Sequence, residues 1–293
     1  MKHFLITGIV SLLCFTASAQ MLLDTVWYDR NWKQSPRDSA FYYRLVYADT
    51  SGNIRFIVRD YYPGGSLQME GFYRSIHPDV KDGKFVYYYP DGRKKLECTF
   101  NLNLVNGTLT EWYPNGALRL QVGYRNGKYH GPFLNLDTSG MPVLSANYRD
   151  GELHGKFISY YPDGRKVRED VYSNGILKKK HCFTREGRDT AWFQYLTLPE
   201  FPGGKNKFQE FVDEHLIYPT EALADKLQGS VELEVQVGKD GRLVHIRVID
   251  SPRQDFAEEA LRVLSASPPW KPGYKDGKPI EMTIHIPIKF RIK

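Results

Sequence analysis

One short turn returns through the middle of the chain at a nearly fixed interval. The segments YYPGG (61–65), YYPDG (88–92), WYPNG (112–116) and YYPDG (160–164) share it, and LDTSG (136–140) is a weaker copy. The glycines that close these turns are Gly65, Gly92, Gly116, Gly140 and Gly164. After a first gap of 27 residues, the interval is 24 residues each time. Two further glycine series, which begin at Gly83 and Gly127, keep this interval, so the chain contains a true internal repeat.

The chemistry of the turn predicts what one repeat is. Proline sets the backbone angle of the second turn position, Asp or Asn suits the third, and Gly tolerates the left-handed fourth. Such a turn joins neighbouring antiparallel strands, and the flanking segments GKFISYY and RKVREDVY have the pattern of short strands. Because a lone hairpin is marginal in water, we expect residues 55–195 to form stacked hairpins that share one apolar face. Residues 20–54 lack the repeat and would cap the open edge of this stack.

The pattern G-x-x-H-G-x-F…Y-Y-P-D-G at 151–164, together with its relatives, resembles MORN-type repeats in the form common in bacterial exported proteins. The resemblance implies a long antiparallel meander that displays a surface. Arrays of this kind have been linked to lipid or partner binding, and some bacterial relatives are named as antitoxin components. His130 and His154 occupy the same turn slot one period apart, so we interpret them as turn residues and predict no metal site.

The first 19 residues, MKHFLITGIVSLLCFTASA, have the pattern of a secretory signal peptide. A basic start at Lys2 precedes a short apolar run, and the run ends in Ala-Ser-Ala before Gln20. Export would place the mature chain in an oxidising compartment. Only Cys98 and Cys182 then remain, at different phases of the repeat, so we expect two buried free thiols, with a disulfide as the alternative.

The formal net charge of +6 belongs to the repeat region. Residues 20–195 hold 25 Lys and Arg against 19 Asp and Glu, whereas residues 196–293 hold 14 against 15. We interpret the basic region as a solvated face, with an anionic envelope surface as the alternative. An exported protein rarely meets nucleic acid, so we expect no nucleic-acid partner. Membrane contact would be peripheral unless the N-terminus is retained as an anchor.

From residue 196 the period stops and a different pattern begins. LPEFPGG (198–204) marks the boundary. A first helix should end at Tyr218-Pro219, a second should run from 220 to Gly229, and a third over 255–266 should start with a capping box of Asp255 and Glu258. SVELEVQV and RLVHIRVI predict a hairpin, and residues 280–292 predict a final strand. The fold class is therefore mainly β: an antiparallel hairpin array, followed at 196–293 by a small α+β domain in the order helix, strand, strand, helix, strand.

The motifs FPGG, YPTEA, GSVELEVQVGKDG, EEALRVL, PPWKPG and PIKF follow one another over residues 198–293. In this order they resemble the C-terminal domain of TonB, in the Bacteroidetes-type branch. The resemblance implies a small sheet backed by two helices, which grips a short extended peptide of outer-membrane transporters and links the proton-motive force to uptake. Transducing members of the family have an N-terminal membrane helix and a Pro-rich linker. This chain departs from them, since a cleavable start and a hairpin array stand in those places.

The last strand is the expected partner-binding surface, because an edge strand offers unpaired backbone groups to an incoming peptide. Pro287 favours an edge, where its missing N–H is tolerated. The expected binding residues are Met282, Thr283, Ile284, His285, Ile286, Ile288, Lys289 and Phe290. Tyr218, Pro219 and Trp270 are candidates for side-chain pockets. Structural roles compete with this, in the core for Trp270 and in the core or at a helix end for Tyr218.

These features together predict a non-enzymatic protein-interaction module of the cell envelope, located in the periplasm and without a cofactor. Its expected partners are outer-membrane transporters or other envelope proteins, with the MORN-like array as a second binding surface. One alternative is a true energy transducer of the TonB type, anchored in the inner membrane by an uncleaved N-terminus. Another is an antitoxin- or immunity-like binding protein, and a homodimer is also open. No H-E-x-x-H, G-x-S-x-G or paired-Cys zinc pattern indicates an enzyme.

Overall fold

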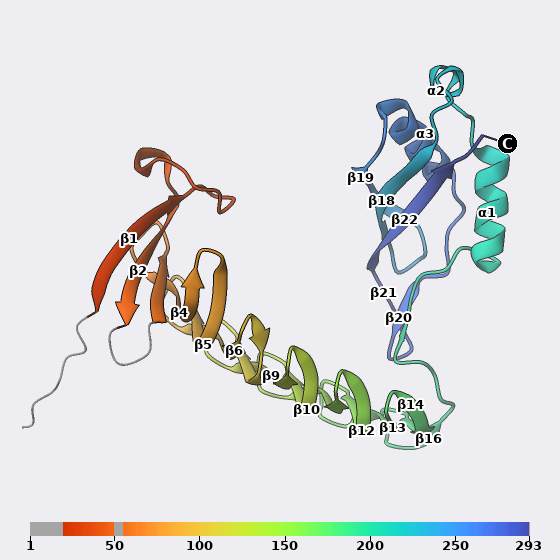
Figure 1. Ribbon diagram of the computed structural model, residues 1–293. Coiled ribbons are helices and arrows are strands. Elements are labelled where there is room, and N and C mark those ends of the chain that lie inside the picture. The colour runs from red at the N-terminus through yellow and green to blue at the C-terminus, as the bar shows by residue number, and fades with distance from the viewer. Residues whose placement is uncertain (1–19, 50–54, 293) are drawn as a thin grey trace, which may run out of the picture. The chain divides into compact units, whose positions relative to one another are not determined.

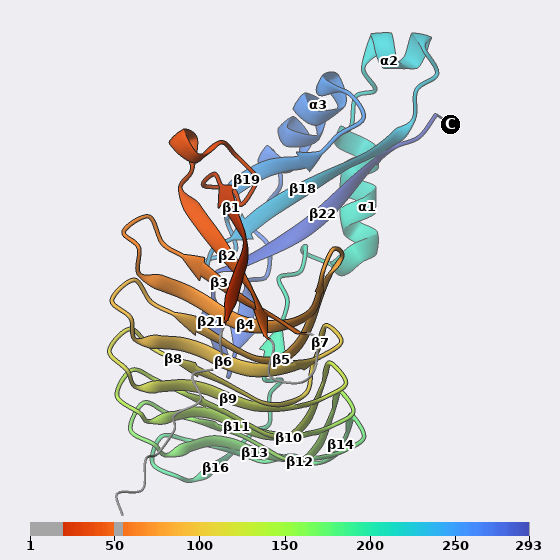
Figure 2. The same ribbon diagram turned by 60° about the vertical axis from the view of Figure 1, so that its left-hand side comes forward.

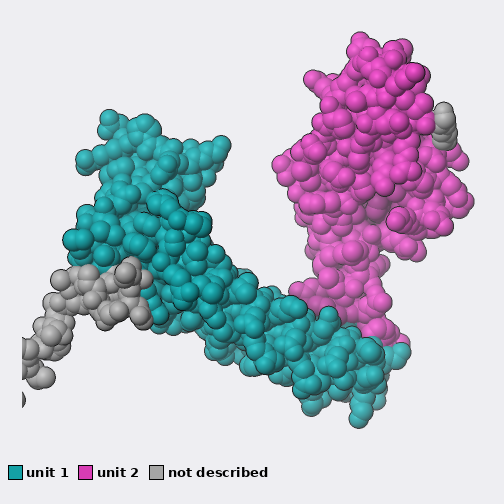
Figure 3. Space-filling view, in the orientation of Figure 1, with its two compact units in different colours: residues 1–190 teal, residues 191–293 magenta. Residues whose placement is uncertain are grey.

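The computed structural model describes residues 20–49 and 55–292, so the predicted signal peptide lies outside the described residues. The chain forms two compact units, residues 1–190 and 191–293, which Figure 3 colours separately. Each unit has its own sheet and its own hydrophobic core, and each is described by itself below.

The first unit is one antiparallel sheet of 16 strands, in which almost every strand pairs with the next strand along the chain (Figures 1 and 2). Short strands β7 and β14 pair only with β6 and β13. The strands are β1 (Met21–Tyr28), β2 (Tyr42–Asp49), β3 (Arg55–Tyr61), β4 (Leu67–Ile76), β5 (Asp79–Tyr88), β6 (Lys94–Asn101), β7 (Leu104–Val105), β8 (Gly107–Trp112), β9 (Leu118–Arg125), β10 (Lys128–Leu136), β11 (Pro142–Arg149), β12 (Glu152–Tyr160), β13 (Lys166–Ser173), β14 (Ile176–Lys179), β15 (Cys182–Phe183) and β16 (Asp189–Thr190). One 3-10 turn, η1 (Arg37–Ser39), lies between β1 and β2.

The core of this sheet is a row of directly paired side chains that crosses strands β2 to β6. Val46 pairs with Val58, Val58 with Gly71, Gly71 with Phe85, and Phe85 with Cys98. Phe85 is fully buried, and its ring covers Gly71 so closely that an added Cβ would lie 2.2 Å from a ring carbon. The glycine therefore makes room for the aromatic ring that fills the row, and the two residues form one packing unit.

The repeated turns have the backbone conformation that their chemistry requires. The five glycines that close them, Gly65, Gly92, Gly116, Gly140 and Gly164, have φ between 79° and 86°. This left-handed region is open to glycine and costly for residues with a Cβ. In each turn the glycine N–H also bonds the carbonyl three residues earlier, as in Gly92 to Tyr89 at 2.9 Å.

In four of the five turns, a tyrosine joins one repeat to the next. The hydroxyl of Tyr62 donates to the carbonyl of Tyr88 at 2.9 Å, and the hydroxyl of Tyr89 donates to that of Trp112 at 2.8 Å. The same bond recurs from Tyr113 to Leu136 and from Tyr161 to Phe183. Each acceptor directly precedes the equivalent turn position of the following repeat. The tyrosine before proline thus links neighbouring turns through its hydroxyl, which explains why the sequence repeats it.

One turn departs from this series. Asp137 stands where the other turns carry tyrosine, and its carboxylate accepts hydrogen bonds from the backbone N–H groups of Ser139 and Met141. The Ser139 hydroxyl also donates to this carboxylate at 2.6 Å, and that bond, together with the backbone bonds, holds the pKa of Asp137 below its usual range. The turn is therefore closed by its own side chain instead of by the link to the next repeat.

Both remaining cysteines are buried and free, as the sequence predicts. Burial raises the pKa of the Cys98 thiol to about 11. Cys182 lies beside the fully buried pair of Arg168 and Asp170: Nη2 of Arg168 lies 3.6 Å from its Sγ, and Nη1 of Arg168 lies 3.0 Å from the Asp170 carboxylate. A protonated Cys98 enclosed in the core is a structural residue, not a reactive one.

The second unit is built around a three-stranded antiparallel sheet in the order β19-β18-β22, with a second small sheet in the order β17-β20-β21. Its elements are β17 (Leu196–Thr197), α1 (Gly204–His215), α2 (Thr220–Ala224), β18 (Gly229–Val237), β19 (Leu243–Asp250), α3 (Gln254–Ser265), β20 (Gly273–Lys275), β21 (Lys278–Ile280) and β22 (Met282–Phe290). Strand β18 alternates fully buried Val231, Leu233, Val235 and Val237 with half-buried polar residues. Helix α3 packs on β18 and β19 and brings Phe256, Ala260, Val263 and Leu264 into the same core.

The fold class is confirmed: a mainly β hairpin array is followed by a small α+β unit. Two local expectations are wrong, and one hairpin was missed. Helix α2 stops at Ala224 because Lys226 turns left-handed, with φ of 53°. Helix α3 has no capping box, since its cap is Arg253, which makes no side-chain cap bond. The hairpin β20–β21, which turns at Asp276-Gly277, was not expected at all.

Substituting Gly71→Ala should destabilise the array by about 1–3 kcal/mol, because the new methyl group must displace the buried Phe85 ring. The matched control is Gly64→Ala, whose Cβ meets nothing within 4 Å. The control should change stability by less than about 0.5 kcal/mol. Urea unfolding followed by circular dichroism measures both, and equal midpoints for the two variants would contradict this packing.

Substituting Tyr113→Phe should cost about 1 kcal/mol, because it removes the hydroxyl that links two repeats while keeping the ring. The control is Tyr148→Phe. The Tyr148 ring packs on Tyr129 and Phe133, and none of the hydrogen bonds among the described residues involves its hydroxyl. Unfolding midpoints should fall for the first variant only. A drop of the same size in both would mean that the inter-repeat bond adds nothing.

Candidate functional site

The last strand, β22, lies at the edge of its sheet. It pairs along its whole length with β18, from Met282 opposite Val237 to Phe290 opposite Gly229. Among the described residues, no strand or loop pairs with its other side. Every second side chain faces the core, so that Ile286, Ile288 and Phe290 are buried while the residues between them are exposed. One set of alternating side chains of β22 therefore packs in the core, while the backbone edge away from β18, the open flank, has no partner strand.

Pro287 fixes which backbone groups face the open flank. It pairs with Glu232 within an uninterrupted register, although it has no N–H to give. Its nitrogen must therefore point away from β18. Because backbone groups alternate sides along a strand, the N–H and C=O groups of Thr283, His285 and Lys289 point the same way. The open flank consequently carries three N–H donors and a row of carbonyl acceptors without a partner strand.

A groove runs along this flank, and helix α1 forms its far wall. In both ribbon views α1 lies beside β22, on the side away from β19 (Figures 1 and 2). One end of the groove, about 520 Å³, is lined by five residues of β22 that include Ile284, His285 and Pro287. The other end, about 820 Å³, reaches Tyr218 and Arg291. Gln209 and Lys289 line both ends, so the two hollows adjoin at these residues.

Aromatic side chains form the floor of the first end. Phe201, Phe208 and Trp270 line it and pack edge to face, with centroid distances of 5.7 Å from Phe201 to Trp270 and 5.4 Å from Phe208 to Trp270. Trp270 is 8% exposed, and its indole N–H donates to the Ser267 hydroxyl at 2.9 Å. Trp270 is therefore a core residue that also shows part of one face to the groove.

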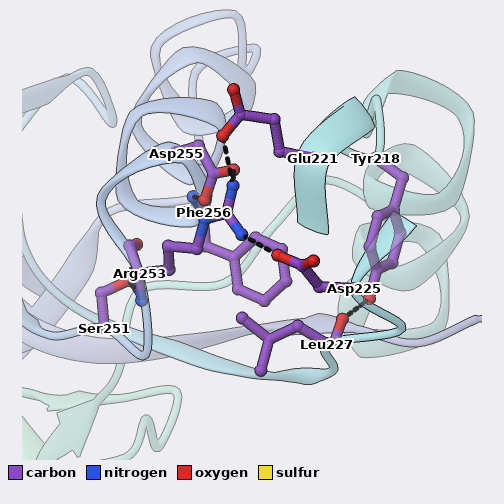
Figure 4. A network of polar contacts seen from close by, with 8 residues as sticks. All are labelled: Tyr218, Glu221, Asp225, Leu227, Ser251, Arg253, Asp255 and Phe256. Carbon is purple, nitrogen blue, oxygen red and sulfur yellow. Dashed lines mark hydrogen bonds and ion pairs between the residues drawn. The ribbon is translucent and has the colours of Figure 1, made fainter. Parts of the chain in front are cut away.

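Tyr218 is held from two sides, by a hydrogen bond to Leu227, drawn in Figure 4, and by ring packing. Its hydroxyl donates to the carbonyl of Leu227. Its ring packs edge to face on Phe256 and Phe290, which stack on each other with centroids 4.1 Å apart. The ring thus joins the segment before α2 to the core, and its remaining surface lines the groove. Pro219, which caps α2, lines neither end of the groove.

A charge cluster holds α2 in place next to Tyr218. The guanidinium of Arg253 contacts the carboxylates of Glu221 at 2.7 Å, Asp225 at 2.8 Å and Asp255 at 3.1 Å (Figure 4). Two of these carboxylates belong to the short helix or its end, and the third belongs to α3. One cation therefore ties a five-residue helix, too short to be stable alone, to the body of the unit.

The charged residues of the groove are unevenly paired. Glu200 forms an ion pair with Lys271 at 3.2 Å, and the carboxylate of Asp213 accepts a hydrogen bond from Gln209. In contrast, Lys205, Lys289 and Arg291 line the groove, and within residues 20–49 and 55–292 none of them has an ion-pair partner. The groove therefore has an excess of unpaired positive charge beside the open flank.

The residues expected to bind a partner do not all meet in one place. Ile284, His285, Ile286 and Lys289 line the groove, whereas Met282 and Thr283 do not. Ile288 and Phe290 lie in the core. The sequence interpretation missed the opposite wall, which includes Phe201, Lys205, Phe208 and Gln209. The FPGG segment before α1 was the available signal, since it begins the helix that forms this wall.

The two histidines of the repeats occupy matching positions. The Nδ1 atom of His130 lies 3.4 Å from the backbone N–H of Asp150, and that of His154 lies 3.4 Å from the backbone N–H of Asn174. Both atoms therefore accept a hydrogen bond from the next RDG or SNG turn. The described residues contain no cluster of three or more side chains suited to a metal ion.

Comparison with known families identifies both parts of the chain. Residues 214–292 match the family model of the Gram-negative bacterial TonB protein C-terminal, and residues 81–102, 105–126 and 153–174 match the MORN repeat variant. Neither is an enzyme family. A search of curated proteins found no match, and no helix in the described part of the chain has the length and apolarity to cross a membrane. The C-terminal unit thus matches the TonB C-terminal family and is preceded by repeats that match the MORN variant, and both matches support an envelope-associated TonB-like module.

Proposed function

We propose that the C-terminal unit is a periplasmic module that grips an extended peptide of an outer-membrane transporter or another envelope protein by β-strand addition. The open flank of β22 carries this proposal, because its outward N–H and C=O groups form a template for a further strand. The match to the TonB C-terminal family supports envelope proteins as partners. The MORN-type array supplies a second surface for a different partner, which makes the whole chain an exported adaptor.

Backbone pairing alone would hold such a peptide weakly. Each hydrogen bond contributes about 0.5–1.5 kcal/mol net, while association costs at least about 4 kcal/mol. Pro287 also removes one donor from the outward row. The groove between α1 and β22 would supply additional affinity, because its apolar walls can bury side chains of a peptide that lies against the flank. Affinity would then come from strand pairing and side-chain burial together.

Substituting His285→Pro tests the flank directly. His285 has the same strand phase as Pro287, so a proline there keeps the ladder with β18 but removes an outward N–H and projects its ring toward the peptide. Capture should weaken about tenfold or more. The measurement is fluorescence polarisation with labelled peptides that copy the N-terminal segments of outer-membrane transporters from the same cell, and circular dichroism checks folding.

The matched control is His285→Ala, which removes the imidazole and its 3.7 Å contact with Glu234 but keeps the N–H. It should weaken binding clearly less than His285→Pro does, because it loses only the groove-lining imidazole and keeps the outward N–H. Deleting residues 282–293 is a poorer test, because it also removes Ile286, Ile288 and Phe290 from the core. If a folded His285→Pro protein bound the peptides with native affinity, strand addition at β22 would be wrong.

A further inference from the structure

We infer that the groove between α1 and β22 selects one chemical class of peptide: an extended segment in which apolar side chains alternate with polar ones and an acidic residue lies opposite Lys289. This inference rests on the proposed function, since it assumes that a strand adds to β22. It goes further by naming the side-chain chemistry of the partner. It is based on a difference in polarity between the two faces of β22, because an added strand would continue both faces.

The side of β22 that faces the helices is mainly apolar, although Lys205 also lines the groove there. Ile284 and Ile286 are its nearest side chains to the groove, and Phe201, Phe208 and Trp270 continue the apolar surface beyond the strand. An added strand points every second side chain to this side. Because about 520 Å³ of groove stands open there, those positions of the peptide should be aliphatic or aromatic. Burial of one such side chain desolvates the aromatic floor as well.

The other side of β22 is basic at its end, whereas earlier in the strand His285 contacts Glu234 at 3.7 Å and Pro287 lies opposite Glu232. Lys289 is exposed on that side, and Arg291 follows it in the same phase. Neither has an ion-pair partner among the residues that the structure describes, whereas the nearby Glu200 is already paired with Lys271. Residues directly opposite each other on neighbouring strands have Cβ atoms about 4.5–5.5 Å apart. An acidic residue of the peptide opposite Lys289 would therefore complete a cross-strand ion pair.

Together, the two sides of β22 determine which residues of the bound peptide face each side. In a strand the side chains alternate, so a peptide that seats an apolar residue against Phe208 presents its neighbour to the basic side. A shift of the peptide by one residue would put its acids onto the aromatic floor and its apolar residues into water. The groove thus rejects the shifted register, and a basic peptide is disfavoured in either register.

The test uses the full mature chain and four labelled nine-residue peptides. The first alternates valine and aspartate, the second valine and lysine, the third valine and threonine, and the fourth contains the residues of the first in scrambled order. Fluorescence polarisation at low salt should rank the first peptide highest, about tenfold above the lysine peptide, with the threonine peptide between them. The scrambled peptide should bind least among the acidic peptides.

Two variants with matched controls localise the effect. Lys289→Glu should reverse the preference between the aspartate and lysine peptides, whereas Lys207→Glu, on the exposed side of α1 and outside the groove, should not. Gln209→Trp should block the groove and weaken all peptides at least tenfold. Glu210→Trp, on the same helix but outside the groove, should leave binding unchanged.

The outcomes separate this inference from the proposed function. Peptides that bind without regard to charge or phase, and that His285→Pro still expels, would overturn the inference and leave strand addition intact. The same holds if Lys289→Glu leaves the ranking unchanged. If no peptide binds the folded chain, or if β22 proves to be covered in a stable dimer that peptides cannot open, both fail. A reversed preference in Lys289→Glu, together with blocking by Gln209→Trp alone, supports the inference.

Discussion

An edge strand leaves half of its backbone hydrogen-bonding groups without a partner in the sheet, and in this protein that condition falls on β22. The strand cannot be removed from the fold, because its alternate residues Ile286, Ile288 and Phe290 fill the core. Nor can it be closed by another strand of the described chain, since its sheet ends there. Pro287 makes this arrangement tolerable by pointing its nitrogen outward. The fold of the unit and its proposed use thus depend on the same nine residues.

The two units solve the problem of exposed strands differently. In the array, almost every strand pairs with the next strand along the chain, and turn tyrosines such as Tyr113 tie consecutive repeats together. Stability there is shared among neighbours, as in other repeat proteins. In the C-terminal unit, a compact core of α3, β18, β19 and β22 leaves the outer flank free. The first unit is therefore a regular repeat array with an extended surface, while the candidate site lies in the C-terminal unit.

Features fixed by local chemistry could be predicted from the sequence. The turn glycines require left-handed backbone, the strict alternation of β18 requires a half-buried strand, and a proline inside the last strand favours an edge. Features set by distant contacts could not be predicted. Strand β17 is only two residues long and pairs with β20 far along the chain, so no local pattern marks it. The hairpin of β20 and β21 had a local Asp276-Gly277 signal, but strands of three residues are too short to show alternation.

The candidate site shows the same division. The sequence pointed to β22 itself, but the opposite wall of the groove depends on where α1 comes to rest beside the strand. Phe208 has the spacing of a core-facing helix residue, and in the structure it does pack against the core while also lining the groove. Tyr218 and Trp270 are likewise both structural and groove-lining, because a groove beside a small core is built from the margin of that core. Sequence spacing alone cannot separate these two roles.

Amide hydrogen exchange of the free full-length chain tests the open flank most directly. If the flank is free, the N–H groups of Thr283, His285 and Lys289 exchange orders of magnitude faster than those of Ile284, Ile286 and Ile288, which bond β18. Equal and strong protection along the whole strand would contradict the account, because it would mean that the outward groups already have a partner.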